Sequence, residues 1–242
     1  MFRAIVYQRA KGELSTVPLG TKMDVYAEGY EWLGHSIAAR NITELDDDPR
    51  VRIGGPDCSQ PYDAALLNIS AMSFGSLSDN AVRALNRGAA AGGFYHNTGE
   101  GGISDYHLEG GGDLVWQVGT GYFGCRSETG GFSPEKFAEK AALPAVRMIE
   151  VKLSQGAKPG HGGILPASKN TAIIARIRGV AEGTEVVSPS AHTVFSGPRG
   201  LLEFLARLRE LAGGKPVGFK LCLGRESEFL GICRAMVETG IT

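Results

Sequence analysis

The sequence has few cysteines and no long apolar run, and both absences exclude classes of protein. Its four cysteines are Cys58, Cys125, Cys222 and Cys233. They show no C-x-x-C spacing, and no histidine, cysteine and carboxylate cluster has metal-ligand spacing, so reduced thiols and no metal site are expected. No apolar run approaches the roughly 18 residues of a membrane span. The N-terminal apolar stretch is too short for a signal peptide, so a cytoplasmic location is the expectation.

An excess of charge of one sign is also missing. The formal net charge is −1, which gives no reason to expect nucleic acid or an acidic membrane surface as a partner. The apolar fraction of 43% suffices for a core. Glycine, by contrast, is abundant, with 35 of 242 residues. It clusters at 99–102, 110–112 and 160–163, which indicates backbone that approaches a ligand closely.

Strand and helix patterns alternate from Asp63 onward, which predicts a parallel sheet with right-handed crossovers. About five βα units can be counted, whereas a closed (β/α)₈ barrel needs eight. The sequence therefore predicts an α/β fold that is an incomplete TIM barrel over residues 63–242. Residues 1–62 carry turn signals and an acidic patch, and are predicted to be an irregular extension that packs on the barrel. The predicted strands are 66–71, 94–97, 114–118, a run from 147, and 217–223; the predicted helices are 78–91, one after Ser133, 171–178, 200–211 and 226–239.

Three predicted strand ends carry polar or glycine-rich motifs. Residues 147–166 (RMIEVKLSQGAKPGHGGILP) run from an apolar strand into a loop with Gln155, Lys158 and His161. Residues 66–75 (LLNISAMSFG) end in a glycine turn, and 217–224 (VGFKLCLG) hold a lysine inside an apolar strand. Enzymes with α/β folds place their chemistry at the carboxyl ends of strands. We therefore expect one site built from these three ends.

These motifs resemble the FMN-binding synthase domain of glutamate synthase. The matching segments are NISAMSFG (68–75), NTGEGG (97–102), KLSQGAKPGHGG (152–163) and FKL (219–221). Segments 20–32 and 213–222 are similar to the stand-alone proteins of the FMN-binding glutamate synthase family, and the resemblance spans most of residues 16–242. It implies a TIM barrel with FMN at its carboxyl face. The implied reaction is the reductive amination of 2-oxoglutarate to glutamate with ammonia or glutamine-derived ammonia, and an iron–sulfur cluster supplies the electrons.

The resemblance also implies roles for individual residues. The backbone at Ala71, Met72 and Ser73 would face the flavin, Gln117 would bind its pyrimidine edge, and Lys152 and Lys220 would lie near the ring. Glu100, Gln155, Lys158 and Arg178 would bind substrate, with Lys220 and Glu100 as the catalytic candidates.

From the residues alone, blander alternatives stay open. Met72 could be a core residue, Glu100 a solvated turn residue, Lys220 a strand-end lysine that reaches solvent and Arg178 an exposed helix-end cation. Lys152 could instead pair near Glu150. The histidines His161 and His192 are candidates for acid–base chemistry, although no partner for them is visible in the sequence.

Some family features are altered or missing. Tyr122 stands in place of an arginine and Ile164 in place of a substrate-contacting glutamine, so an FMN barrel for another small acid or amine is an alternative. The glycine-rich flavin phosphate segment and the cluster cysteines are not found. The sequence is therefore expected to be a fragment that binds FMN weakly or not at all, with open strand edges that invite self-association. A catalytically inactive barrel that serves as a binding or structural subunit is the other alternative, and the electron donor stays unassigned.

Overall fold

A computed structural model describes residues 2–13, 24–32, 34, 36–38, 40–44, 48–155, 160 and 162–242. The chain divides into two compact units, 1–47 and 48–242. The first contains the helix α1 (Phe2–Ala10) and a short 3₁₀ helix, η1 (Ile42–Glu44), neither of which was predicted. The assignment of residues 1–62 to an extension stays a prediction. All that follows concerns the second unit.

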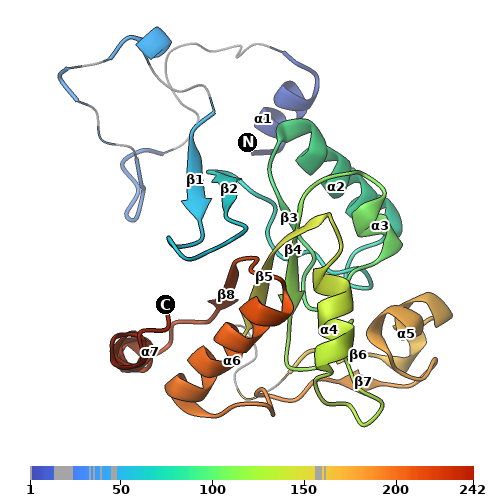
Figure 1. Ribbon diagram of the computed structural model, residues 1–242. Helices are drawn as coiled ribbons and strands as arrows, with labels where there is room; N and C mark the ends of the chain where they lie inside the picture. Colours follow the sequence, from blue (N-terminus) through green and yellow to red (C-terminus); the bar gives the residue numbers. More distant parts are fainter. Residues whose placement is uncertain are drawn as a thin grey trace. The chain divides into compact units, whose positions relative to one another are not determined.

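A four-stranded parallel sheet forms the centre of this unit (Figure 1). Its order is β3-β4-β5-β8. The pairing of β4 with β5 starts with Leu114 opposite Val146, and that of β5 with β8 starts with Ile149 opposite Val217. The predicted α/β class and the parallel sheet are confirmed, whereas the barrel stays a prediction. The strands are β3 (His96–Asn97), β4 (Leu114–Val118), β5 (Val146–Lys152) and β8 (Val217–Lys220).

The predicted helices are confirmed, and their ends follow local signals. The Ser78 side chain accepts a hydrogen bond from the Ala81 N–H at 3.3 Å and caps the first of them. Gly93 ends the same helix with a φ of 64°, a conformation that glycine adopts without strain. The helices of the sheet region are α2 (Asp79–Gly92), α3 (Asp105–Leu108), α4 (Pro134–Ala141), α5 (Ala172–Arg178), α6 (Gly197–Leu211) and α7 (Glu226–Thr239), with a 3₁₀ turn, η2 (Ala167–Lys169).

The predicted strand at 66–71 is wrong, because this segment forms only one parallel bridge, between Ile69 and His96. The Asn68 side chain donates to the Ala65 carbonyl at 2.7 Å and accepts from the Tyr95 N–H at 3.2 Å. Side-chain bonds of this kind compete with a regular strand ladder. The last predicted strand also ends earlier, at Lys220. Two short antiparallel pairs were missed: β1 (Arg50–Ile53) with β2 (Tyr62–Ala65), and β6 (Ile164–Leu165) with β7 (Val186–Val187).

The two faces of the sheet differ in chemistry because side chains alternate along a strand. One face buries Trp116, Ile149 and Val151 in the main core with residues of α4, α6 and α7. The opposite face carries a small apolar group that includes Val115 and Met148. Further along the same strands, this second face turns polar, and that change positions the candidate site.

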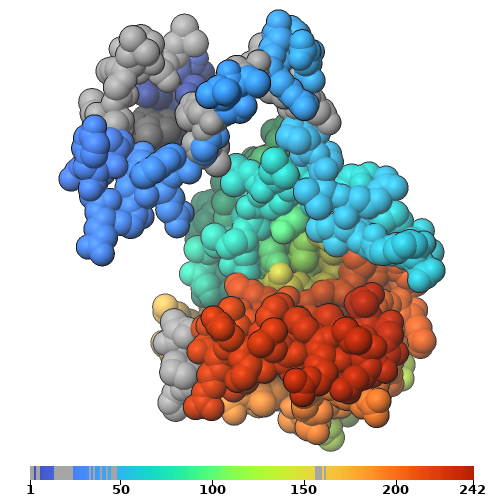
Figure 2. All heavy atoms as spheres, turned by 90° about the vertical axis from the view of Figure 1, so that its left-hand side faces the viewer, coloured from blue at the N-terminus to red at the C-terminus, as the bar shows by residue number. Residues whose placement is uncertain are grey.

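The helix α7 forms an exposed surface of this unit (Figure 2). Three of its apolar residues are exposed: Phe229 by 40%, Leu230 by 61% and Val237 by 86%. Within the described ranges, no helix is long and apolar enough to cross a membrane.

Candidate active site

Three predicted residues meet at the carboxyl ends of the strands. The Lys152 Nζ atom, at the end of β5, lies 2.9 Å from Glu100 Oε1, in the loop after β3. The Gln155 amide nitrogen donates to the same carboxylate oxygen. The side chains of Lys152 and Glu100 are only 15% and 21% exposed. Glu100 is therefore not a solvated turn residue, and the partner of Lys152 is Glu100 rather than a group near Glu150.

Glycines allow this close arrangement. A Cβ atom on Gly119 would lie 2.5 Å from Glu100 Oε2. A Cβ atom on Gly99, which has a φ of 66°, would lie 2.7 Å from the Ser73 backbone nitrogen. Any larger residue at either position would push apart the loops that hold Glu100.

A second polar group lies beside the first on the same face of the sheet. Glu150 Oε1 accepts hydrogen bonds from Asn97 Nδ2 at 3.0 Å and from Gln117 Nε2 at 2.6 Å. Gln117 is 1% exposed and already uses its amide N–H on Glu150. Its contact with a flavin stays a prediction. No role was predicted for Asn97 or Glu150, although Glu150 lies two residues before Lys152 and so faces the same side of β5.

Arg178 is buried, with 9% of its surface exposed, so the interpretation as an exposed helix-end cation is wrong. Its guanidinium lies 5.0 Å from the centre of the Phe123 ring. Burial lowers the pKa of Arg178, and the negative charge of Glu100 opposes that shift. Within the described parts of the chain, Arg178 forms no ion pair, and its Nε atom has no hydrogen-bond partner. Such a cation is costly without an anion beside it.

The backbone of the 71–73 segment is held in place by two other elements. The Met72 N–H donates to the Asn97 carbonyl at 3.0 Å. The Met72 carbonyl lies 3.0 Å from His107 Nε2. The Ser104 N–H donates to His107 Nδ1 at 3.2 Å, so the proton of the neutral ring is on Nε2, which donates to Met72. The orientation of Ala71, Met72 and Ser73 toward a flavin stays a prediction.

Lys220 is exposed and lies opposite Lys152 in the strand register. This position suits a strand-end lysine in contact with solvent, and a role beside a flavin stays a prediction. Two further predicted residues, Lys158 and His161, lie outside the described residues.

His192 supports the end of β5. It is 8% exposed, and its Nε2 atom lies 2.8 Å from the Lys152 carbonyl, which can only accept. Nδ1 is therefore the acceptor for the Tyr122 hydroxyl at 3.2 Å. Burial lowers the pKa of His192. A neutral ring with both nitrogens hydrogen-bonded is suited to holding the Lys152 backbone and the Tyr122 side chain in place. Tyr122 itself has a backbone φ of 52°. Ile164, the other altered position, is 52% exposed on β6.

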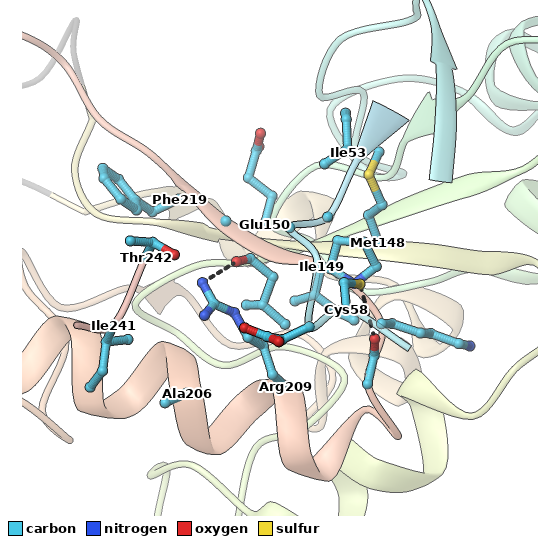
Figure 3. Close-up of a pocket in the computed structure, with 18 of the residues that line it drawn as sticks. Ile53, Cys58, Met148, Ile149, Glu150, Ala206, Arg209, Phe219, Ile241 and Thr242 are labelled. Carbon is cyan, nitrogen blue, oxygen red and sulfur yellow. Dashed lines mark hydrogen bonds between the residues drawn. The ribbon is translucent and has the colours of Figure 1, made fainter. Parts of the chain in front are cut away.

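Another cavity lies elsewhere, along the outer edge of β8 (Figure 3). It measures about 690 Å³ and is lined by Met148, Glu150, Phe219 and Arg209 among others. Arg209 Nη2 donates to the Val217 carbonyl at 3.4 Å across this edge. Glu150 borders the cavity and also binds Gln117, whereas Glu100, Lys152 and Gln155 line a separate narrow crevice.

The described residues contain no group of three or more histidine, cysteine, aspartate or glutamate side chains that could hold a metal ion. All four cysteines are free.

Comparison with known proteins identifies the family. A family model described as "Conserved region in glutamate synthase" matches residues 15–239. The chain belongs to the glutamate synthase family. Within this family it is 43% identical to the glutamate synthase large subunit-like protein YerD of Bacillus subtilis (strain 168) over 196 residues, which is 80% of this chain and 37% of YerD.

Two other relatives in the glutamate synthase family have a similar extent of match. The archaeal-type glutamate synthase [NADPH] of Thermotoga sp. (strain RQ2) is 33% identical over 74% of this chain and 33% of its own length. A glutamate synthase large subunit-like protein of Rhizobium meliloti (strain 1021) is 32% identical over 84% of this chain and 44% of its own length. The chain thus spans between about a third and under a half of each of these relatives.

Proposed function

We propose that this chain carries the substrate-binding part of a glutamate synthase-type oxidoreductase. In the proposed reaction, 2-oxoglutarate is reductively aminated to glutamate, with reduced FMN as the hydride donor. Membership of the family supports the reaction class. The activity, the substrates and the partners of this particular chain are part of the proposal.

The observation that carries the proposal is the buried Arg178, which forms no ion pair with the described residues. Arginine presents a planar set of donors that matches a carboxylate in a bidentate way. A buried guanidinium without a protein anion among the described residues is stabilised when a ligand supplies the anion. A dicarboxylate such as 2-oxoglutarate has that charge.

The donor set of the sheet suits a flavin. Lys152 and Lys220 place two ammonium groups at neighbouring strand ends, and positive charge there favours an electron-rich ring. The backbone at 71–73 and the amide of Gln117 are the other groups that would hold the cofactor. When bound and reduced, FMN would supply the hydride that reduces the imine formed from ammonia and 2-oxoglutarate.

The remaining roles belong to the chain's own side chains. Arg178 binds one substrate carboxylate. Gln155 and Lys152 are kept in place by the shared oxygen of Glu100. The Glu100 carboxylate is then available, once one donor turns to the substrate, to accept a hydrogen bond from ammonia. His192 orients the backbone at Lys152.

The test is glutamate formation by the 242-residue chain. The chain is mixed with FMN, the flavin is reduced chemically, and 2-oxoglutarate and ammonium are added. We expect glutamate, detected by mass spectrometry, in amounts that depend on the protein, and a loss of at least about tenfold in Glu100→Gln. Lys169→Gln changes an exposed residue away from Glu100, Lys152 and Gln155. It serves as the control and should form as much glutamate as the unmodified chain. A folded, flavin-containing chain that forms no glutamate would contradict the proposal.

A further inference from the structure

A second crevice, of about 220 Å³, lies away from the sheet face and is bordered by α3, α4, α5 and the loop before α4. Its volume is below the range of roughly 300–1,000 Å³ that is typical of sites for drug-sized ligands. Its charged lining consists of Arg126, Lys136, Lys140, Arg176, Arg178 and Asp105.

The charges of this crevice are not balanced. Its one carboxylate, Asp105, is paired with Arg176 at 3.0 Å. Arg126 donates to the Gly121 carbonyl at 3.0 Å, and Lys136 donates to the Arg126 carbonyl at 3.0 Å. Within the described ranges, neither Arg126 nor Lys136 has a carboxylate within ion-pair distance. Because the whole chain has a net charge of −1, this excess of positive charge is local.

Repulsion between two lysines destabilises the helix α4. Lys136 and Lys140 are four residues apart and so lie on the same face of the helix. Like charges at this spacing destabilise a helix slightly. Among the described residues, Lys140 forms an ion pair with Glu139 alone, at 3.5 Å, and that carboxylate is 73% exposed, so it neutralises little. A bound anion would stabilise the neighbouring cations Arg126, Lys136 and Lys140 together.

We propose that this crevice binds a small phosphate-type dianion, either inorganic phosphate or the phosphoryl group of a small phosphomonoester. Arginine and lysine are the residues that hold phosphoryl oxygens most strongly. The crevice is too small for a whole nucleotide with its base enclosed. The proposal does not rest on the proposed reductive amination, although Arg178, the proposed substrate ligand near Glu100, also borders this crevice.

The test is calorimetric titration of the full 242-residue chain at pH 8 and constant ionic strength, with sodium chloride as the balancing salt. The two probes are inorganic phosphate and glycerol 3-phosphate. We expect saturable binding at one site for at least one of them. Binding of phosphate alone would assign the site to the free ion, and binding of both would assign it to a phosphomonoester group.

Two double variants decide where the anion binds. Lys136→Gln with Lys140→Gln removes two cations of the crevice, and we expect affinity to fall by on the order of tenfold or more. Lys169→Gln with Arg199→Gln removes the same charge from exposed positions outside the crevice and should leave affinity within about twofold. Circular dichroism checks that both variants are folded. Absence of saturable binding, or an equal loss in the two variants, would overturn the proposal.

Discussion

At the scale of single residues, the buried histidines His96 and His107 are the side chains most sensitive to acid. Their rings lie 5.2 Å apart between centroids. Both ring nitrogens of His96 are buried and have no hydrogen-bond partner in the described parts of the chain. Burial, with a smaller contribution from His107, lowers the pKa of His96 to about 4. Burial also lowers the pKa of His107, against the opposing effect of the Met72 carbonyl.

We therefore expect stability to fall as the pH drops from about 6.5 toward 4. In this range an unfolded histidine takes up a proton while the folded one does not, so protons favour the unfolded chain. His96 alone should contribute about 2 to 3 kcal/mol of this loss. Urea unfolding at several pH values measures this loss of stability. His96→Leu should give a shallower pH dependence over this range, and curves that run parallel for the two proteins would contradict this assignment.

The sequence predicted some residues of the candidate site well and others poorly. Glu100, Lys152 and Gln155 were named from the family resemblance, and the structure brings them together because the ends of parallel strands meet at one edge. The burial of Arg178 was not predictable, since it depends on how α5 packs against Phe123 and the glycines at 75 and 101. Asn97 and Glu150 were missed because their link joins two strands that are not adjacent in the sheet.

At the scale of elements, local signals decided where prediction succeeded. Helix α2 begins after a serine cap and ends at a glycine, and its predicted bounds differ from the observed ones by one residue at each end. Strands depend on partners elsewhere in the chain, so β1, β2, β6 and β7 were missed. The failure at 66–71 has the same origin, because Asn68 competes for the bonds that a ladder would use.

The serine cap of α2 gives a direct test at this scale. Ser78→Ala removes the acceptor for the Ala81 N–H, and we expect the free energy of unfolding to fall by about 1 kcal/mol. Ser78→Asp, which keeps a side-chain acceptor, should retain most of the stability. Chemical denaturation measures both. Equal stability of the alanine and aspartate variants would show that the cap contributes nothing.

At the scale of the whole molecule, two surfaces favour association with other chains. Among the described strands, β8 has a neighbour on one side only, and open strand edges accept further strands. The exposed apolar residues of α7 include Leu230 and Val237, and contiguous apolar surface promotes association. We propose self-association through this region.

Sedimentation velocity at increasing concentration tests this proposal. We expect the sedimentation coefficient of the unmodified chain to rise with concentration, and Leu230→Lys with Val237→Lys to suppress the rise. Val187→Lys, which changes a residue of β7 that is 58% exposed, is the control. A constant sedimentation coefficient for the unmodified chain would contradict self-association.

Arg178 is proposed to bind a substrate carboxylate, and calorimetric titration of the chain with 2-oxoglutarate measures this binding. Arg178→Gln should weaken binding by at least about tenfold, because the neutral amide loses the charge-assisted bond. It should not lower the melting temperature, since removing a buried, unpaired cation relieves a cost. Arg176→Gln, an exposed arginine on the same helix, is the matched control and should bind within about twofold of the unmodified chain. Unchanged affinity in Arg178→Gln would contradict the account.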